Sequence, residues 1–218
     1  MRVPLRGMNS PRKRHFKCAV VGDSQCGKTS LLRSYTTNLA FPYTVQYSRP
    51  LPSQYPVKQL VQGKEHTATI TDTNCTDLES RVTAYNRADV IILCFSLVDK
   101  SSFTNVKDIW LKELEQYCLN TPIVLVGTKS DLVHSSGVKR KEIVKVCHIQ
   151  KLLQDQRIHK YCESSAFTKD GLFAVFQETF NAAWVGPVRF VTRMKTVNST
   201  KMNKLKSLLF PCIYTQTK

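Results

Sequence analysis

Apolar residues along this chain form short runs of strand length, separated by polar turns and by segments with helical spacing. The pattern predicts strands in five segments, the second of which is a hairpin: residues 16–23, 57–71, 88–97, 121–132 and 157–166. The hairpin turns at Gln62-Gly63-Lys64, and its arms alternate or nearly alternate in polarity. No apolar run is long enough to span a bilayer, so buried strands are expected instead.

A first helix is predicted over about 27–35, directly after the first strand. Three further segments repeat apolar residues at helical spacing and are also predicted to be helices: 101–118, 141–156 and 170–185. The residues expected to face inward are Phe103, Val106, Trp110, Leu114 and Tyr117 in the second helix, Ile143, Val146, Ile149 and Leu153 in the third, and Leu172, Val175, Phe176 and Phe180 in the fourth. Ser101 is the expected N-cap of the second helix. Because strands and helices alternate, this order predicts an α/β domain with a mostly parallel sheet.

Basic residues are concentrated at the two ends of the chain. The net charge is +16; residues 1–17 contain six Lys or Arg, residues 185–218 contain seven, and neither segment contains an acid. We therefore expect three parts: a basic tail over 1–15, one domain over 16–186 and a second basic tail over 187–218. Such tails fit contact with an anionic membrane face or, less well, nucleic acid; solvated tails without a partner are the alternative. No specific nucleic acid is expected, and the protein is expected to be a monomer.

The compartment follows from the N-terminus and the cysteines. The first residues lack the apolar run of a secretory signal, so a cytoplasmic protein is expected. The eight cysteines show no CxxC pair and no zinc-like spacing with histidine, which favours reduced thiols. The chain ends TQTK, without a prenylation box. Cys212 follows a basic, amphipathic stretch and is either a palmitoylation site at the plasma membrane or an ordinary cysteine in a tail.

Residues 22–29, GDSQCGKT, match the phosphate-binding pattern G-x-x-x-x-G-K-[ST] between a predicted strand and a predicted helix. Gly22 and Gly27 allow the backbone to curl so that successive N–H groups face one anion, with a helix N-terminus behind them. Lys28 can reach the terminal phosphates, and the Thr29 hydroxyl can bind magnesium. The alternative is a glycine-rich turn without a ligand.

Two weaker features follow later strands. In VGTKSDL, residues 126–132, the Asp131 carboxylate can accept both donors on the edge of guanine, and the stem of Lys129 can lie over the base. In ESSAF, residues 163–167, Ser165 and the Ala166 N–H can brace the base. Each feature lies where a predicted strand ends, which is the edge at which doubly wound sheets bind ligands.

These motifs, with the hairpin VQGKEHTATITDT and the runs ADVIILCFSL and PIVLVGTKSDL, resemble a Ras-superfamily small GTPase of the Rho family over about 16–184. The phosphate loop is similar to that of the atypical Rnd subgroup. The resemblance implies a Ras-like doubly wound P-loop NTPase domain, with a six-stranded, mostly parallel sheet and helices on both faces. It also implies GTP/GDP and Mg²⁺ as ligands, with effectors, exchange factors or GAP-like proteins bound through residues 41–55 and 74–87.

The resemblance and the motifs together define the expected site. The residues expected to bind nucleotide are Gly22, Asp23, Ser24, Gln25, Cys26, Gly27, Lys28, Thr29, Ser30, Phe41, Asp72, Thr128, Lys129, Asp131, Ser165 and Ala166. Magnesium is expected at Thr29 and Asp72. Phe41 would pack on guanine, or else anchor its loop in the core. No catalytic residue is expected.

Three positions depart from the family pattern. Ser24 stands where most members have a glycine, and its side chain crowds the space needed by an attacking water. After Asp72-Thr73, the family glycine is replaced by Cys75 and the water-orienting glutamine by Thr76. Threonine is too short to hold a water as an amide does. We therefore expect assisted hydrolysis to be crippled.

The long loop over 38–56 contains four of the nine prolines and is about three residues longer than the family's. Its expected magnesium-binding threonine corresponds either to Thr44 or to Pro50, depending on which end is counted from. If Pro50 occupies the position, that ligand is lost.

The combined expectation is an atypical Rho-like GTP-binding protein, GTP-loaded with weak or absent hydrolysis, that controls the actin cytoskeleton, cell shape or polarity through effectors. Two alternatives stay open: a competent but slow GTPase, and a pseudo-GTPase interaction module that binds nucleotide weakly or not at all.

Overall fold

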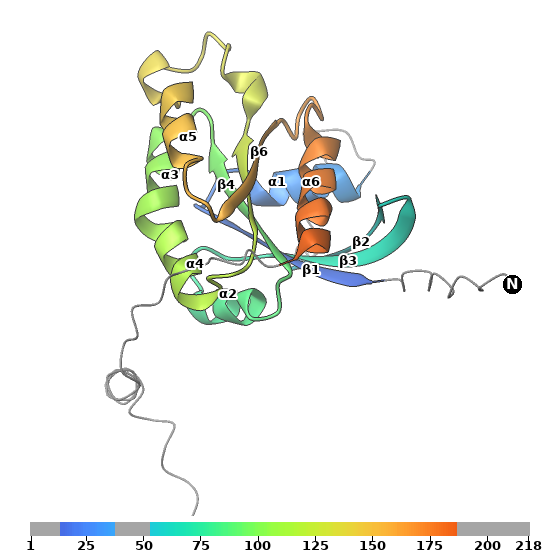
Figure 1. Cartoon of the computed structure of the whole chain (residues 1–218). Helices are drawn as coiled ribbons and strands as arrows, with labels where there is room; N and C mark the ends of the chain where they lie inside the picture. Colours follow the sequence, from blue (N-terminus) through green and yellow to red (C-terminus); the bar gives the residue numbers. More distant parts are fainter. Residues whose placement is uncertain (1–13, 38–52, 187–218) are drawn as a thin grey trace, which may run out of the picture. The chain divides into compact units, whose positions relative to one another are not determined.

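A six-stranded sheet in the order β2-β3-β1-β4-β5-β6 forms the centre of the fold in the computed structural model, which describes residues 14–37 and 53–186 (Figure 1). The strands are β1 (His15–Gly22), β2 (Gln54–Val61), β3 (Lys64–Asp72), β4 (Val90–Ser96), β5 (Ile123–Thr128) and β6 (Ile158–Ser164). Only the β2–β3 pair among them is antiparallel. This arrangement confirms the prediction of a mostly parallel, six-stranded sheet.

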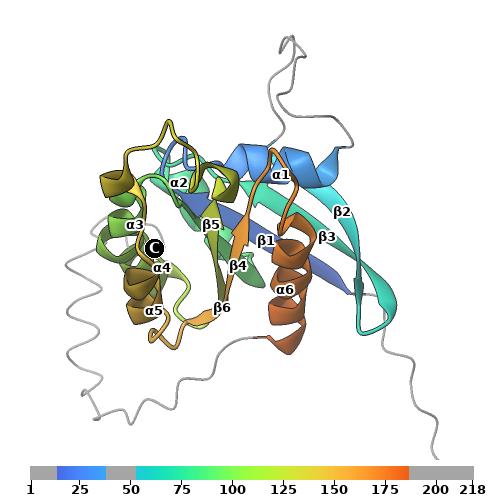
Figure 2. The same cartoon turned by 90° about the horizontal axis from the view of Figure 1, so that it is seen from above.

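Helices cover both faces of the sheet, as the sequence predicts (Figure 2). The helical elements are α1 (Lys28–Thr36), α2 (Leu78–Tyr85), α3 (Lys100–Asn105), the π-helix η1 (Val106–Trp110), α4 (Leu111–Tyr117), the 3₁₀ turns η2 (Ser130–Leu132) and η3 (Arg140–Glu142), α5 (Val146–Leu152) and α6 (Leu172–Val185). Side chains of α1 and α6 pack on one face; those of α2, α3, η1, α4 and α5 pack on the other.

Strand β4 explains why the core strands appear as uninterrupted apolar runs. All of its seven residues are buried. Ile92 and Cys94 belong to the core that α1 and α6 cover, whereas Ile91, Leu93 and Phe95 belong to the core on the opposite face. A strand covered by helices on both faces is apolar at nearly every position, here at all but Ser96, so alternation disappears.

The β2–β3 hairpin turns where the sequence predicts. Val61 pairs with Lys64, which leaves Gln62 and Gly63 as a two-residue loop. Both loop residues have positive φ, 52° and 73°. Positive φ at both positions is the signature of the type I′ turn, whose twist matches that of the flanking strands.

Two helix predictions need correction. Asp99, not Ser101, caps α3, since its carboxylate accepts hydrogen bonds from the N–H groups of Ser101 and Ser102. The predicted helix over 141–156 forms only as η3 and the seven-residue α5. Val146 is 65% exposed and Leu153 37% exposed, so neither lies on the inward face. The buried contacts of this segment come from Ile149 and from Val144, which precedes the helix.

The helix predicted over 101–118 forms without a break as α3, the π-helical turn η1 and α4. Of its expected inward residues, Val106, Trp110 and Leu114 are buried, and Phe103 and Tyr117 pack at the edge of the same cluster. No helix within the described ranges has the length and apolarity to cross a bilayer. Phe41, Thr44, Pro50, Cys212 and nearly all of both basic tails lie outside the described residues.

Candidate functional site

The candidate residues gather at one edge of the sheet. Strands β1, β3, β5 and β6 run parallel and end at Gly22, Asp72, Thr128 and Ser164. Each segment that carries a motif therefore leaves the sheet at the same edge, where the carboxyl ends of parallel strands form a crevice for ligands.

The phosphate loop between β1 and α1 requires its two glycines. Gly22 has φ 139°, and a Cβ there would lie 2.2 Å from the carbonyl oxygen of Cys94. Gly27 has φ 105°, and a Cβ there would lie 3.2 Å from Oγ1 of Thr128. Side chains rarely adopt these backbone conformations. At Gly22 the backbone of β4 leaves no room for a Cβ, and at Gly27 the Thr128 side chain would have to shift. The loop is therefore packed directly against β4 and β5.

Lys28 begins α1 and curls back over the loop. Its side chain is 8% exposed, and Nζ donates hydrogen bonds to the carbonyl oxygens of Gly22 (2.8 Å) and Asp23 (2.6 Å). These carbonyls hold the ammonium beside the loop's concave side, where an anion can meet it. Ser24 and Gln25 are exposed on the outer turn, and Gln25 has φ 60°.

Cys26 faces the interior rather than the loop's ligand side. Its thiol is buried and donates to the carbonyl oxygen of Cys94 at 3.6 Å. Burial raises the pKa of this thiol to about 11, against the lowering influence of nearby Lys28. The thiol is therefore neutral at physiological pH and contributes packing. Ser30, one turn into α1, lines the neighbouring cavity described below.

Thr29 and Asp72 meet although they lie 43 positions apart. Thr29 Oγ1 donates to Asp72 Oδ2 at 2.5 Å, while the buried Asp72 Oδ1 has no hydrogen-bond partner. Burial raises the pKa of the Asp72 carboxyl, and the Thr29 hydrogen bond and the charge of Lys28 partly offset that effect. An unsatisfied carboxylate oxygen beside a hydroxyl is an oxygen donor set of the kind Mg²⁺ prefers.

No cluster of three or more His, Cys, Asp or Glu side chains within the described ranges could hold a metal by itself. A magnesium ion at Thr29 and Asp72 would therefore share its coordination with phosphate oxygens and water, which is how Mg²⁺ binds in nucleotide sites.

A cavity of about 420 Å³ lies next to the phosphate loop. Its walls include Gly27 and Ser30 from the phosphate loop and α1, Lys129 and Asp131 after β5, and Ala166 after β6. The two later motifs, predicted as weak signals, are thus brought together in one pocket. Lys129 adopts φ 58° and caps the short turn η2, which contains Asp131. The volume is in the range of small-ligand pockets.

Two of the expected base-binding residues have structural partners instead. The buried Thr128 hydroxyl bonds to the carbonyl oxygens of Cys26 and Phe95, so it ties the phosphate loop to β4 and β5. Ser165 is fully buried, and its Oγ accepts hydrogen bonds from the N–H groups of Phe167 (3.1 Å) and Thr168 (3.0 Å). Both residues shape the pocket through the backbone rather than through a free hydroxyl.

Sequence reasoning missed several walls of this pocket. Leu31, Leu132, Ser164 and Phe167 also line it. Phe167 is 55% exposed, an unusual degree of exposure for a large aromatic ring. The phenylalanine directly after Ser165-Ala166 was the available signal, because base-binding sites commonly supply an apolar wall.

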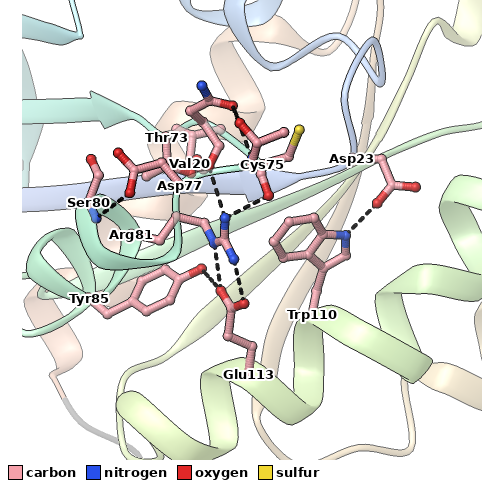
Figure 3. Close-up of polar contacts among 12 residues, drawn as sticks. Val20, Asp23, Thr73, Cys75, Asp77, Ser80, Arg81, Tyr85, Trp110 and Glu113 are labelled. Carbon is pink, nitrogen blue, oxygen red and sulfur yellow. Dashed lines mark hydrogen bonds and ion pairs between the residues drawn. The ribbon is translucent and has the colours of Figure 1, made fainter.

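The segment after Asp72 begins with an anchor and continues with a local turn (Figure 3). The buried Thr73 hydroxyl donates to the carbonyl oxygen of Val20 at 2.7 Å, which fixes the chain against β1. Asn74 Oδ1 accepts both the N–H (3.1 Å) and the hydroxyl (3.0 Å) of Thr76. Cys75 is half-buried and packs against the core cluster on the α2–α5 side. Thr76 therefore uses its hydroxyl inside its own turn.

Arg81 of α2 fixes this turn through hydrogen bonds to its backbone. Its Nη1 donates to the carbonyl oxygens of Asn74 (3.0 Å) and Cys75 (2.7 Å), and its Nε and Nη2 both bond to Glu113 of α4. Tyr85 donates to the same carboxylate at 2.6 Å. The Glu113 hydrogen bond raises the pKa of Arg81 still further, so its charge is permanent. All three guanidinium nitrogens of Arg81 are therefore engaged in hydrogen bonds within the protein.

The phosphate loop is also connected to the helix formed by α3, η1 and α4. Asp23 accepts a hydrogen bond from Nε1 of Trp110 (2.7 Å), and the guanidinium carbon of Arg81 lies 5.3 Å from the centre of the Trp110 ring (Figure 3). Asp23 also accepts a hydrogen bond from Nδ2 of Asn105 (2.7 Å). Trp110 ends the π-turn η1. The indole therefore bonds to the phosphate loop through its N–H and lies against Arg81 with its ring, a connection that no local motif reveals.

A family model described as the Ras family matches residues 17–184 of this chain. The chain belongs to the Ras family. The match spans β1 to α6, so it includes the phosphate loop, the Asp72 segment and the base pocket. Ras-family proteins bind guanine nucleotide and Mg²⁺ and act through effectors and regulators, and this Ras-family chain is a small GTP-binding protein. The prediction of a small GTPase is confirmed; membership of the Rho branch stays a prediction.

Proposed function

We propose that this Ras-family protein is an atypical, Rho-like signalling protein that retains GTP because hydrolysis is weak or absent. It would regulate the actin cytoskeleton, cell shape or polarity through effectors. The Rho branch and the actin role rest on the similarity of the hairpin, β4 and β5 sequences to Rho proteins.

The hydrogen bonding of Thr76 carries the proposal on hydrolysis. Thr76 stands where switch GTPases have a glutamine that orients the attacking water. Its hydroxyl donates to Asn74 Oδ1 at 3.0 Å, and this short side chain has no second polar group to offer. Ser24, exposed on the phosphate loop, adds bulk near the same space. Two independent changes therefore oppose turnover.

The described residues offer groups for each part of a guanine nucleotide. Backbone N–H groups of the phosphate loop and Lys28 would bind phosphates, and Thr29 with Asp72 would hold Mg²⁺. Lys129 and Asp131 would contact guanine, with Ala166 at the pocket wall. Magnesium would neutralise phosphate charge when bound. Groups that bind nucleotide, together with the changes at Thr76 and Ser24, favour a protein that keeps GTP bound over a pseudo-GTPase with an empty site.

Partner contact would use the surface over 74–87, which includes the Asn74 turn and α2, together with residues 41–55. Of the second range, only residues 53–55 lie in the part that the structure describes. The basic tails would add attraction to an anionic plasma-membrane surface.

Identification of the co-purified nucleotide tests the proposal. The full chain would be purified, denatured and its released nucleotide separated by chromatography. Mostly GTP supports the proposal, mostly GDP supports a slow but competent GTPase, and no nucleotide supports a pseudo-GTPase. An Asp131→Ala variant with an unchanged circular dichroism spectrum is the control, since loss of the guanine-binding carboxylate should reduce the amount released.

A further inference from the structure

A second cavity, of about 610 Å³, lies between the continuous helix α3–η1–α4 and α5, and shares no wall with the base pocket. Phe103, Lys107 and Leu111 line one wall at intervals of four residues, and Leu152 of α5 lines the other. Leu111 is buried, while Phe103 and Leu152 are half-buried against the core. The floor of this helix groove is therefore apolar and rigidly supported.

The rim of the helix groove is basic. Lys100, Lys107 and Lys112 project from α3, η1 and α4, and Lys151 projects from α5. The side-chain ammonium groups of these four lysines have no hydrogen bond or ion pair with another residue of the described ranges.

Arg157, at one end of the groove, differs from these lysines because the protein already uses its charge. Its guanidinium donates to Asp155 (2.6 Å) and to the carbonyl oxygen of Leu111 (3.0 Å). Asp108 is the other acid in the groove wall, so two carboxylates face six basic or imidazole side chains. The unneutralised charge of the rim is positive.

The spacing of the lysines indicates an elongated ligand. Twelve residues separate Lys100 from Lys112, which corresponds to about 18 Å along a helix. Charges spread over that length cannot converge on one small anion. They match a segment of several helical turns or an extended strand, with acidic residues beside apolar ones.

We propose that the helix groove binds an acidic, amphipathic segment of a partner protein. Apolar side chains of the segment would occupy the floor at Phe103, Leu111 and Leu152, and its carboxylates would meet the rim lysines, as in other helix-in-groove complexes. The chain's own tails do not fit, because residues 187–218 contain seven Lys or Arg and no acid. A second copy docked by the same face would set lysines against lysines.

A synthetic, fluorescein-labelled helical peptide of about 15 residues, long enough for the rim, tests this inference against the full chain by fluorescence anisotropy. Its polar face carries glutamates and its apolar face Leu and Phe. The double variant Lys107→Glu/Lys112→Glu should weaken binding by about tenfold or more, since close charge pairs contribute more than 1.4 kcal/mol at interfaces.

The matched control is Lys139→Glu/Lys141→Glu, which changes net charge equally at exposed positions outside the groove. Binding should weaken less than about twofold, the effect of long-range attraction alone. Hydrogen exchange with bound peptide should protect residues 100–112 and 146–152. Peptides with Gln for Glu, or Ala for Leu and Phe, should each bind more weakly.

Several results would overturn the inference. Equal losses in the two double variants would mean that the peptide responds to net charge only. Protection of other segments instead would show that the peptide binds outside the helix groove. Protection of 100–112 by phosphatidylserine vesicles but not by peptide would make this face a membrane surface. A dimer of the native chain that Lys107→Glu/Lys112→Glu dissociates would make it a contact between copies.

Discussion

Arg81 and Glu113 form a two-pronged ion pair, with Nε–Oε1 and Nη2–Oε2 distances of 2.8 and 2.7 Å (Figure 3). The two side chains are only 7% and 13% exposed. The remaining guanidinium nitrogen, Nη1, holds the carbonyl oxygens of Asn74 and Cys75. One arginine therefore joins α2 and α4 to the segment that follows Asp72. The backbone of this segment is fixed by hydrogen bonds from Arg81.

Replacement of Arg81 by methionine should lower the free energy of unfolding by about 3 kcal/mol, because Glu113 would stay buried with its charge uncompensated except by Tyr85. Urea denaturation of the full chain measures this change. The control is Lys58→Met: Lys58 and Glu65 also form an ion pair, but they are 71% and 47% exposed. That change should cost less than about 1 kcal/mol. Similar losses in both variants would contradict a structural role for the Arg81 pair.

Glu113 should also make stability depend on acid pH. Burial alone would raise its pKa, but hydrogen bonds from Arg81 and Tyr85 outweigh burial and hold the pKa below the ordinary value of 4.5. Because the pKa is lowered on folding, the contribution is complete above that ordinary value and is lost as pH falls through the lowered one. Urea unfolding from neutral pH downward should show a loss of stability below about pH 4.5 that is shallower in Glu113→Gln. Parallel curves would contradict this assignment.

The sequence alone predicts those features whose residues lie close together in the chain. The phosphate loop was predictable because its signal, two glycines and a Lys-Thr pair, lies within eight residues. Strand β4 was predictable because burial on both faces goes with apolar residues at every position except Ser96. Asp131 and Ala166 were brought into one pocket as expected, since parallel strands end at one edge.

Other features depend on partners far along the chain. The roles of Thr128 and Arg81 follow from bonds to Cys26 and Glu113, 102 and 32 positions away, and hydrophobic periodicity carries no sign of them. The length of the helix at α5 was overestimated because Val146 is apolar but does not pack into the core, and is 65% exposed. Periodicity indicates which residues can face a core; only packing decides which of them do.

Gly22 and Gly63 separate two costs of adding a side chain. Both have positive φ, but a Cβ at Gly22 would lie 2.2 Å from Cys94 O, whereas a Cβ at Gly63 meets nothing within 4 Å. Gly63→Ala should therefore cost about 1–2 kcal/mol of backbone strain alone. Gly22→Ala adds a clash with a rigid strand and should cost more than about 3 kcal/mol or prevent folding. Thermal unfolding monitored by circular dichroism compares the two, and equal costs would contradict the close packing of the loop on β4.

If Cys75 and Thr76 weaken hydrolysis, as we propose, restoring the family residues at these positions should raise the hydrolysis rate. The variant Cys75→Gly/Thr76→Gln restores a flexible backbone and an amide long enough to orient water. We expect single-turnover phosphate release from bound GTP to rise by about 10²-fold, the lower end of what a positioned proton-transfer group contributes. Adding Ser24→Gly should raise the rate again, because it removes bulk on the opposite side of the same space.

The matched control for this experiment is Glu79→Gln, which introduces a glutamine at an exposed position three residues beyond Thr76. It should leave the rate unchanged, since the resemblance places the water-orienting glutamine at position 76 and not at position 79. A rise in Glu79→Gln as large as in the double variant would show that any nearby amide suffices. No rise in either, with GTP still bound, would place the block elsewhere, at Ser24 or in the chain's first long loop. Arg81 should hold the altered turn in both variants, because it contacts only the carbonyl oxygens of residues 74 and 75 there.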